Sequence, residues 1–94
     1  MPHSISAKKR QRQNEQRRMR NRARRSEIRT TVRSFHDALR DHDLNSAEDR
    51  FRAVAKKLDQ IAAKGTIHKN LASRRKSRAQ KKLNALRAAA AAKA

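Results

Sequence analysis

The chain is short and strongly basic. Its 94 residues include 27 Lys or Arg against 8 Asp or Glu, which gives a formal net charge of +19. Seventeen of its hydrophobic residues are alanine, so the core is small and the repulsion between like charges opposes compaction. We therefore expect a single small domain that is marginally stable alone and needs a polyanion to become compact.

The composition also excludes several classes of protein. Because the chain has no cysteine, it has neither a disulfide framework nor a thiolate metal site. No apolar run approaches the ~18 residues of a membrane span, and the N-terminus lacks the apolar stretch of a signal peptide. We expect a soluble, cytoplasmic protein. One Gly and one Pro leave little turn chemistry for strands, so the sequence favours helices.

The first predicted helix covers about residues 5–41, with Ser4 or Ser6 as its N-cap. Its apolar stripe has spacings of +4, +3 and +4, and consists of Ile28, Val32, Phe35 and Leu39. Before Ile28 the same face carries arginines, whose charges a bundle cannot bury unpaired. The first half of this helix is therefore expected to project beyond the bundle.

A loop over residues 41–46 precedes the second helix, at about 46–63, with Asn45 or Ser46 as its cap. Its stripe is Ala47, Phe51, Val54, Ala55, Leu58, Ile61 and Ala62, and Gly65 takes the left-handed position after its end. The third helix is predicted at about 67–91 with Thr66 as its cap. Its stripe is Ile67, Leu71, Ala72, Ala79, Leu83, Leu86 and Ala90, interrupted by Arg75.

The charge is unevenly distributed along these helices. Residues 1–33 carry twelve basic and two acidic residues, residues 34–63 carry five and six, and residues 64–94 carry ten and none. Short loops make consecutive helices antiparallel neighbours. The predicted fold is thus an all-α three-helix bundle, one domain over 1–94, with a long, basic, projecting first helix. Both basic arms converge on one side of it, and the acids of the second helix lie on the other. The turn between the second and third helices is expected to bring together two sets of residues: His68, Lys69, Asn70 and Arg74, and Arg22, Arg25 and Arg29.

The two basic arms are the candidate binding residues. Arginine presents a planar fork to phosphate oxygens, and each phosphate that it neutralises releases counterions. The alternatives are a solvated basic tail or targeting signal for the first arm, and a helix start with exposed polar residues for the second. The candidate RNA-binding residues are Lys8, Lys9, Arg10, Arg17, Arg18, Arg22, Arg24, Arg25, Arg29, His68, Lys69, Asn70, Arg74, Arg75, Lys76 and Arg78.

Other kinds of site find little support in the sequence. No two of the four histidines have the i, i+4 spacing of a helical zinc site, so we expect no metal and no other cofactor. The acids of the middle segment are explained as caps and local ion pairs, and no catalytic triad or nucleotide motif is present, so we expect no enzyme and no small-molecule substrate. With only two Phe, both on apolar stripes, stacking platforms for single strands are not expected, and recognition is predicted to use phosphates, sugars and RNA shape.

Three segments resemble a known family. They are residues 6–10 (SAKKR), residues 21–31 (NRARRSEIRTT) and residues 62–70 (AAKGTIHKN), the last followed by Ala72, Arg74, Lys76 and Ser77. In order and spacing they resemble bacterial small-subunit ribosomal protein twenty, the bS20 family. The resemblance implies a three-helix bundle that binds 16S ribosomal RNA in the small ribosomal subunit, and it adds Lys82 to the candidate RNA-binding residues.

Two rival functions were weighed against this one. A basic nucleoid-associated protein that binds DNA fits the composition equally well, although neither clear repeats nor groove-inserting wedges are evident. A membrane-active basic helix is disfavoured, because the apolar stripes of the three segments are needed for one another. The sequence thus predicts a structural RNA-binding protein that is associated with the ribosome.

Overall fold

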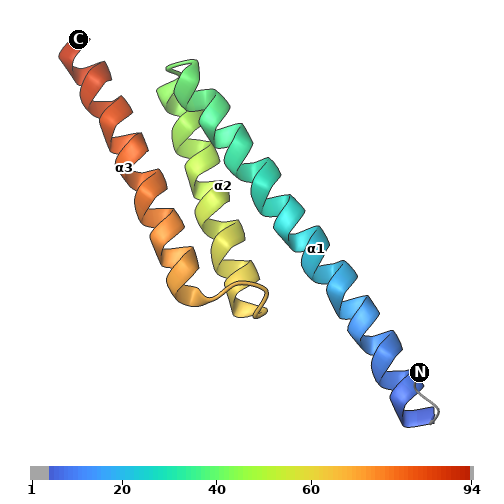
Figure 1. The fold of residues 1–94 in the computed structure, drawn as a ribbon. Coiled ribbons are helices and arrows are strands. Elements are labelled where there is room, and N and C mark those ends of the chain that lie inside the picture. Colours follow the sequence, from blue (N-terminus) through green and yellow to red (C-terminus); the bar gives the residue numbers. More distant parts are fainter. Residues whose placement is uncertain (1–4, 94) are drawn as a thin grey trace.

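The computed structural model describes residues 5–93, and it consists of three α-helices joined by two short loops (Figure 1). The helices are α1 (Ile5–Arg40), α2 (Leu44–Ala63) and α3 (Lys69–Lys93). Residues 5–93 contain no strand, so the all-α prediction is confirmed. The molecule is elongated, at 69 × 22 × 16 Å, because α1 is much longer than the helices that pack against it.

The core lies where both outer helices meet α2, while α1 and α3 scarcely contact each other. Phe35, Leu58 and Leu83, one from each helix, are the largest fully buried side chains. Burying a side chain of this kind stabilises a fold by ~1.5–3 kcal/mol. The other buried hydrophobic residues are Ile28, Ala38, Ala47, Val54, Ile61, Ala72, Ala79 and Leu86, all on the predicted stripes except Ala38.

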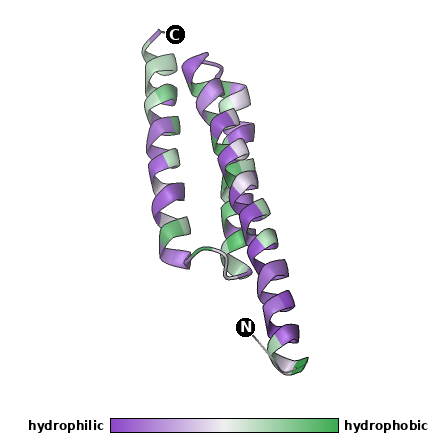
Figure 2. Cartoon of the chain, turned by 45° about the vertical axis from the view of Figure 1, so that its right-hand side comes forward, coloured by the Kyte–Doolittle hydropathy of each residue, from purple (hydrophilic) through white to green (hydrophobic). Residues whose placement is uncertain are grey.

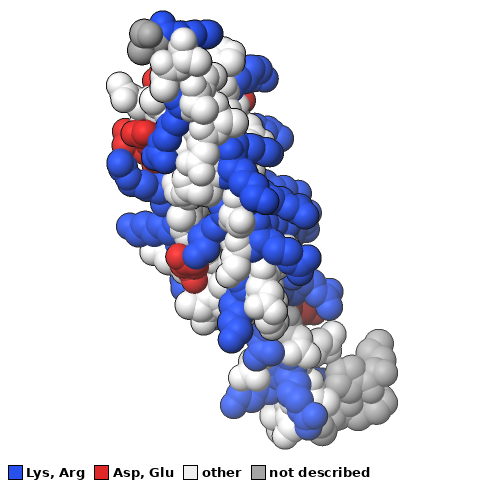
Figure 3. All heavy atoms as spheres, turned by 90° about the vertical axis from the view of Figure 1, so that its left-hand side faces the viewer, with Lys and Arg blue, Asp and Glu red and all other residues white. Residues whose placement is uncertain are grey.

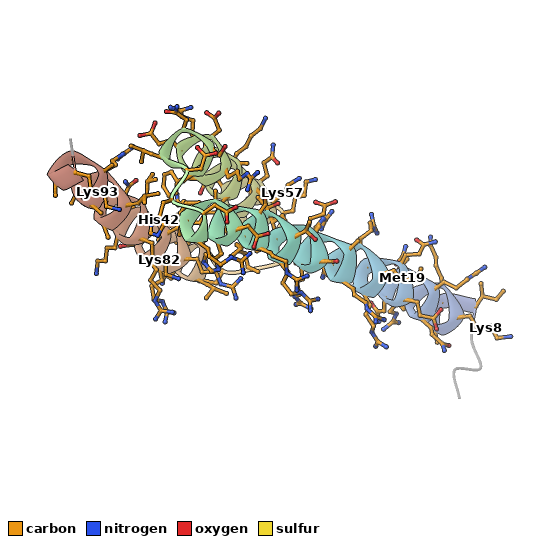
Figure 4. The ribbon with its side chains drawn as sticks, turned by 90° about the horizontal axis from the view of Figure 1, so that it is seen from above. Lys8, Met19, His42, Lys57, Lys82 and Lys93 are labelled. Carbon is orange, nitrogen blue, oxygen red and sulfur yellow. The ribbon has the colours of Figure 1, made fainter. Side chains whose placement is uncertain are left out.

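The first half of α1 has no helix beside it. Residues 8–20 are all exposed. This segment extends past the α2–α3 loop as a mostly hydrophilic helix (Figure 2), and Lys8 and Met19 mark it in Figure 4. Even Met19, a large hydrophobic residue, is 72% exposed there. The projection expected from the arginines before Ile28 is confirmed. Ser6 lies inside the helix rather than capping it, and Ser4 lies outside the described residues.

The α1–α2 turn differs from its prediction by two residues. α2 begins at Leu44, and its N-cap is Asp43, whose side chain accepts a hydrogen bond from the Ser46 backbone N–H at 3.2 Å. The Ser46 hydroxyl also donates to Asp43, at 2.7 Å. Both hydrogen bonds lower the pKa of Asp43, and the bond from the Ser46 hydroxyl has the larger effect. Asn45 and Ser46 are therefore inside the helix, because Asp43 is extended and Ser46 stands at the N3 position that a cap bonds.

The α2–α3 loop holds a second correction. Gly65 has a φ of +79° and ends α2 as predicted, with its N–H donating to the Ala62 carbonyl at 3.0 Å. α3 begins at Lys69 rather than at 67, because His68 caps it: the Asn70 backbone N–H donates to the His68 Nδ1 at 3.1 Å. The prediction that Thr66 caps α3 is wrong.

Thr66 instead fastens the loop to α1. Its side chain is buried, and its hydroxyl donates to the Asn21 Oδ1 at 2.9 Å and accepts from Arg24 at 3.2 Å. Arg24 also donates to Asn21, at 3.3 Å. We call these three residues the Thr66 latch. It joins the α2–α3 loop to α1 just where the projecting half begins, and so fixes the position at which the two basic arms meet.

Candidate nucleic-acid interface

Within the described part of the chain, every ion pair between helices involves α2. Lys57 of α2 pairs with Glu27 of α1 at 3.3 Å. On the opposite side, Asp59 of α2 pairs with Lys76 of α3 at 2.7 Å. A further pair joins Glu48 of α2 to Arg87 of α3 at 3.1 Å. We call these two lines of contact, α1–α2 and α2–α3, the seams. Three of the eight acids of the chain thus lie where α2 meets its neighbours.

On the third side of the bundle, between α1 and α3, residues 5–93 form no such pairs. There the helices leave a groove of about 430 Å³, which we call the α1–α3 groove. Its floor is apolar, formed by Ile28, Val32, Phe35, Val54, Leu58 and Ala79, and its walls are basic, formed by Arg29, Arg33 and His36 of α1 and Arg75, Arg78 and Lys82 of α3. Figure 3 views the face that carries α3 and shows Lys and Arg side chains over most of its length. Among the described residues, no carboxylate forms an ion pair with any of the five wall cations.

A second hollow, of about 420 Å³, continues the groove towards the α2–α3 loop. It brings Arg25 and Arg29 of α1 together with His68 and Arg75 of the second basic arm, as the sequence predicted for three of these four residues. Thr66, Ile67, Ile28 and Leu71 complete its lining. Of the other residues expected to converge here, Arg22, Lys69, Asn70 and Arg74 are exposed but do not line the hollow.

The basic wall of the groove continues along the projecting half of α1. Arginines recur at spacings of +4, +3, +4 and +4, which places them on one side of the helix: Arg18, Arg22, Arg25, Arg29 and Arg33. The remaining candidates of this arm, Lys8, Lys9, Arg10 and Arg17, are exposed on the same projecting segment. A single helix thus carries one row of cations from its exposed portion into the groove.

The side chains of Arg24 and Lys76 are held by partners on a neighbouring element. Arg24 is half-buried in the Thr66 latch, and Lys76 points to α2 and pairs with Asp59. Sequence reasoning also missed two residues of the groove walls, Arg33 and His36. The signal for Arg33 was available, because it follows Arg29 by one helical turn on the same side.

His36 lies close to the cations of the opposite wall. Its Nε2 is 3.3 Å from the Lys82 Nζ, and its ring lies 5.9 Å from that of Phe35, tilted by 42°. Partial burial, and then the charge of Lys82, lower the pKa of His36, while Asp37 opposes the shift. Both causes favour the uncharged form of the ring, in which the Nε2 can accept a hydrogen bond from the Lys82 ammonium.

This arrangement suits the binding of a polyanion. Unpaired guanidinium groups on two facing helices can each bind a phosphate oxygen pair, and the separation between them is fixed by the core rather than by the ligand. Within residues 5–93, no three acidic or histidine side chains are gathered as they would be around a metal ion. None of the three helices is long and apolar enough to span a bilayer.

Comparisons with known proteins identify the family. The family model described as Ribosomal protein S20 matches residues 2–84. The small ribosomal subunit protein bS20 of Rhodopirellula baltica is 51% identical over 78 residues, which cover 83% of this chain and 87% of that protein. The bS20 protein of Shouchella clausii is 50% identical over 88 residues, or 94% of this chain and all of that protein. A ribosomal protein family, not an enzyme family, accounts for nearly the whole sequence, and the chain belongs to the ribosomal protein S20 family.

Proposed function

We propose that this protein is a structural component of the small ribosomal subunit that binds 16S ribosomal RNA directly, in the cytoplasm, and stabilises its folded arrangement. The observation that supports this best is the separation of charge. Glu27, Glu48 and Asp59 form ion pairs at the seams of α2, while within residues 5–93 no ion pair involves the cations of the α1–α3 groove or of the projecting half of α1. Family membership supplies the ribosomal context for that surface.

The two basic arms are proposed to bind different stretches of RNA backbone. Double-helical RNA hides its base edges in a deep, narrow groove and offers phosphates and 2′-hydroxyls instead. The projecting half of α1 offers arginines around its axis, so it can lie between RNA helices and contact more than one of them. The core holds α3 at a fixed angle to that rod. Specificity then comes from the relative placement of the two arms, and affinity comes from neutralised phosphates and released counterions.

Two measurements test the proposal. In a sucrose gradient of cell lysate, the protein is expected to sediment with the small subunit and to leave it when the subunit is stripped with high salt. In a binding assay, the purified chain is expected to prefer 16S ribosomal RNA to a DNA duplex of equal length at physiological salt. Equal affinity for both, together with co-sedimentation with chromosomal DNA, would instead support the nucleoid-associated alternative.

A further inference from the structure

The apolar floor of the α1–α3 groove is the edge of the bundle core, and Val32 is its partly exposed residue. Phosphate oxygens gain nothing from contact with Val32, and they lose hydration when they are placed there. Arginine heads at the rim could hold a backbone without any hollow between them. The groove therefore matches a ligand with an apolar, flat body and anionic ends.

The two walls of the groove carry charges of the same sign. Arg29 and Arg33 on one side face Arg75 and Arg78 on the other, and no acid lies between them in the described part of the chain. α2 holds the two outer helices in place from the opposite side. With about 430 Å³, the space lies within the range of roughly 300–1,000 Å³ that small ligands occupy in proteins.

One wall also carries an exposed aromatic ring. His36 lies on α1 beside the floor, one turn beyond Val32 and next to Lys82 of the opposite wall. Burial, and then the charge of Lys82, lower the pKa of this ring, which favours a flat uncharged face beside the wall cations. Imidazole rings are among the side chains on which unpaired RNA bases stack.

We propose that the α1–α3 groove receives one unpaired nucleotide of the bound RNA. Its base lies on Val32 and against the His36 ring, and the phosphates on either side of it lie between the arginines of the two walls. A nucleotide inside a double helix does not fit this description, because both faces of its base are already stacked. The inference rests on the proposed RNA-binding function and adds to it a site that recognises a base.

Chemical footprinting of the complex of the full chain with 16S ribosomal RNA tests this site. Dimethyl sulfate and a carbodiimide together modify unpaired bases of all four kinds, whereas hydroxyl radicals report on the backbone. We expect the protein to protect an unpaired base that regains its reactivity with His36→Ala and stays protected with His36→Phe, which keeps an aromatic ring. Loss of the stacking contact is expected to weaken binding about tenfold, within the range of ~1–3 kcal/mol per stacked base.

Matched variants separate the groove from charge in general. Lys82→Glu on the groove wall and Lys56→Glu on the exposed face of α2 change the net charge equally, and only the first is expected to expose the base. Val32→Asp is a second test of the floor, with circular dichroism as the check on folding. A backbone footprint in which no base depends on His36 or Val32 overturns the nucleotide site alone. The absence of any backbone footprint overturns the RNA-binding function and this site with it.

Discussion

The two seams of α2 and the α1–α3 groove both carry long cationic side chains, but these side chains have acidic partners only at the seams. At the seams, long cationic side chains such as Lys57 and Lys76 reach an acid on the next helix, and the helices pack closely. At the groove, equally long cations face one another without an acid, and the helices stay apart. The difference shows that three of the eight acids pair cations between helices, which leaves the charge of the groove walls available to a partner on one side.

The largest expected effect is on the core that both regions share. Leu58 is fully buried in α2, so Leu58→Ala is expected to lower the free energy of unfolding by about 2–5 kcal/mol. Urea unfolding followed by circular dichroism measures it, with Lys56→Ala as an exposed control on the same helix that should change stability by less than ~0.5 kcal/mol. Equal effects of the two substitutions would show that α2 is not the centre of the core.

The second prediction compares one cation from each region of α3. Arg78→Ala in the groove is expected to weaken RNA binding and to reduce the slope of log affinity against log salt by about one unit. Arg87→Ala at the α2–α3 seam should leave that slope unchanged, because Arg87 already has Glu48 as its partner. A salt titration of affinity for 16S ribosomal RNA measures both. If Arg78→Ala and Arg87→Ala reduce the salt slope equally, the groove and the seam contribute equally to RNA binding.

A smaller effect is expected from the seam itself. A double-mutant cycle with Asp59→Asn and Lys76→Met should give a coupling energy of ~0.2–1 kcal/mol, because both side chains are partly exposed to solvent. Asp59→Asn alone should leave the RNA affinity unchanged or slightly increased, since it removes a negative charge remote from the groove. A large loss of affinity would mean that the acids themselves contact RNA.

The smallest effect is the titration of His36. In the free protein, NMR should give this ring a pKa below the ordinary value of about 6.5, which Lys82→Met raises and Asp37→Asn lowers further. Because the folded state binds this proton less well than the unfolded state, the contribution of His36 to stability is present above the ordinary pKa and is lost as the pH falls through it. If Lys82→Met leaves the pKa of His36 unchanged, the His36 ring does not lie beside Lys82 in the groove.

Local patterns were enough to predict the helices and most of the core. The stripes from Ile28 to Leu39 and from Ala47 to Ala62 have helical spacing that no strand shares, and the arginines before Ile28 excluded burial of that face. The position of the caps was less determined. Asp43, Asn45 and Ser46 are all good N-caps, and only the backbone conformation distinguishes them.

Contacts between distant residues were beyond the reach of such patterns. Thr66 has the chemistry of a helix cap, and nothing near it in the sequence shows that its hydroxyl bonds Asn21, 45 residues away. The same holds for Lys76, which is one of many cations until packing places Asp59 beside it. The convergence of Arg25 with His68 was predicted correctly, because it follows from helix order and short loops alone.

The position of α2 between its neighbours has a consequence for folding kinetics. Its contacts join helices that follow one another along the chain, α1 with α2 and α2 with α3, and the pair that is far apart in sequence scarcely touches. Such a topology requires only short loops to close, so its contact order is low, and helical domains of low contact order fold in microseconds to milliseconds. Either helical hairpin, α1–α2 or α2–α3, can form first, and the groove is complete once the remaining helix has docked on α2. No separate docking of α1 on α3 is then needed, so this step does not slow folding.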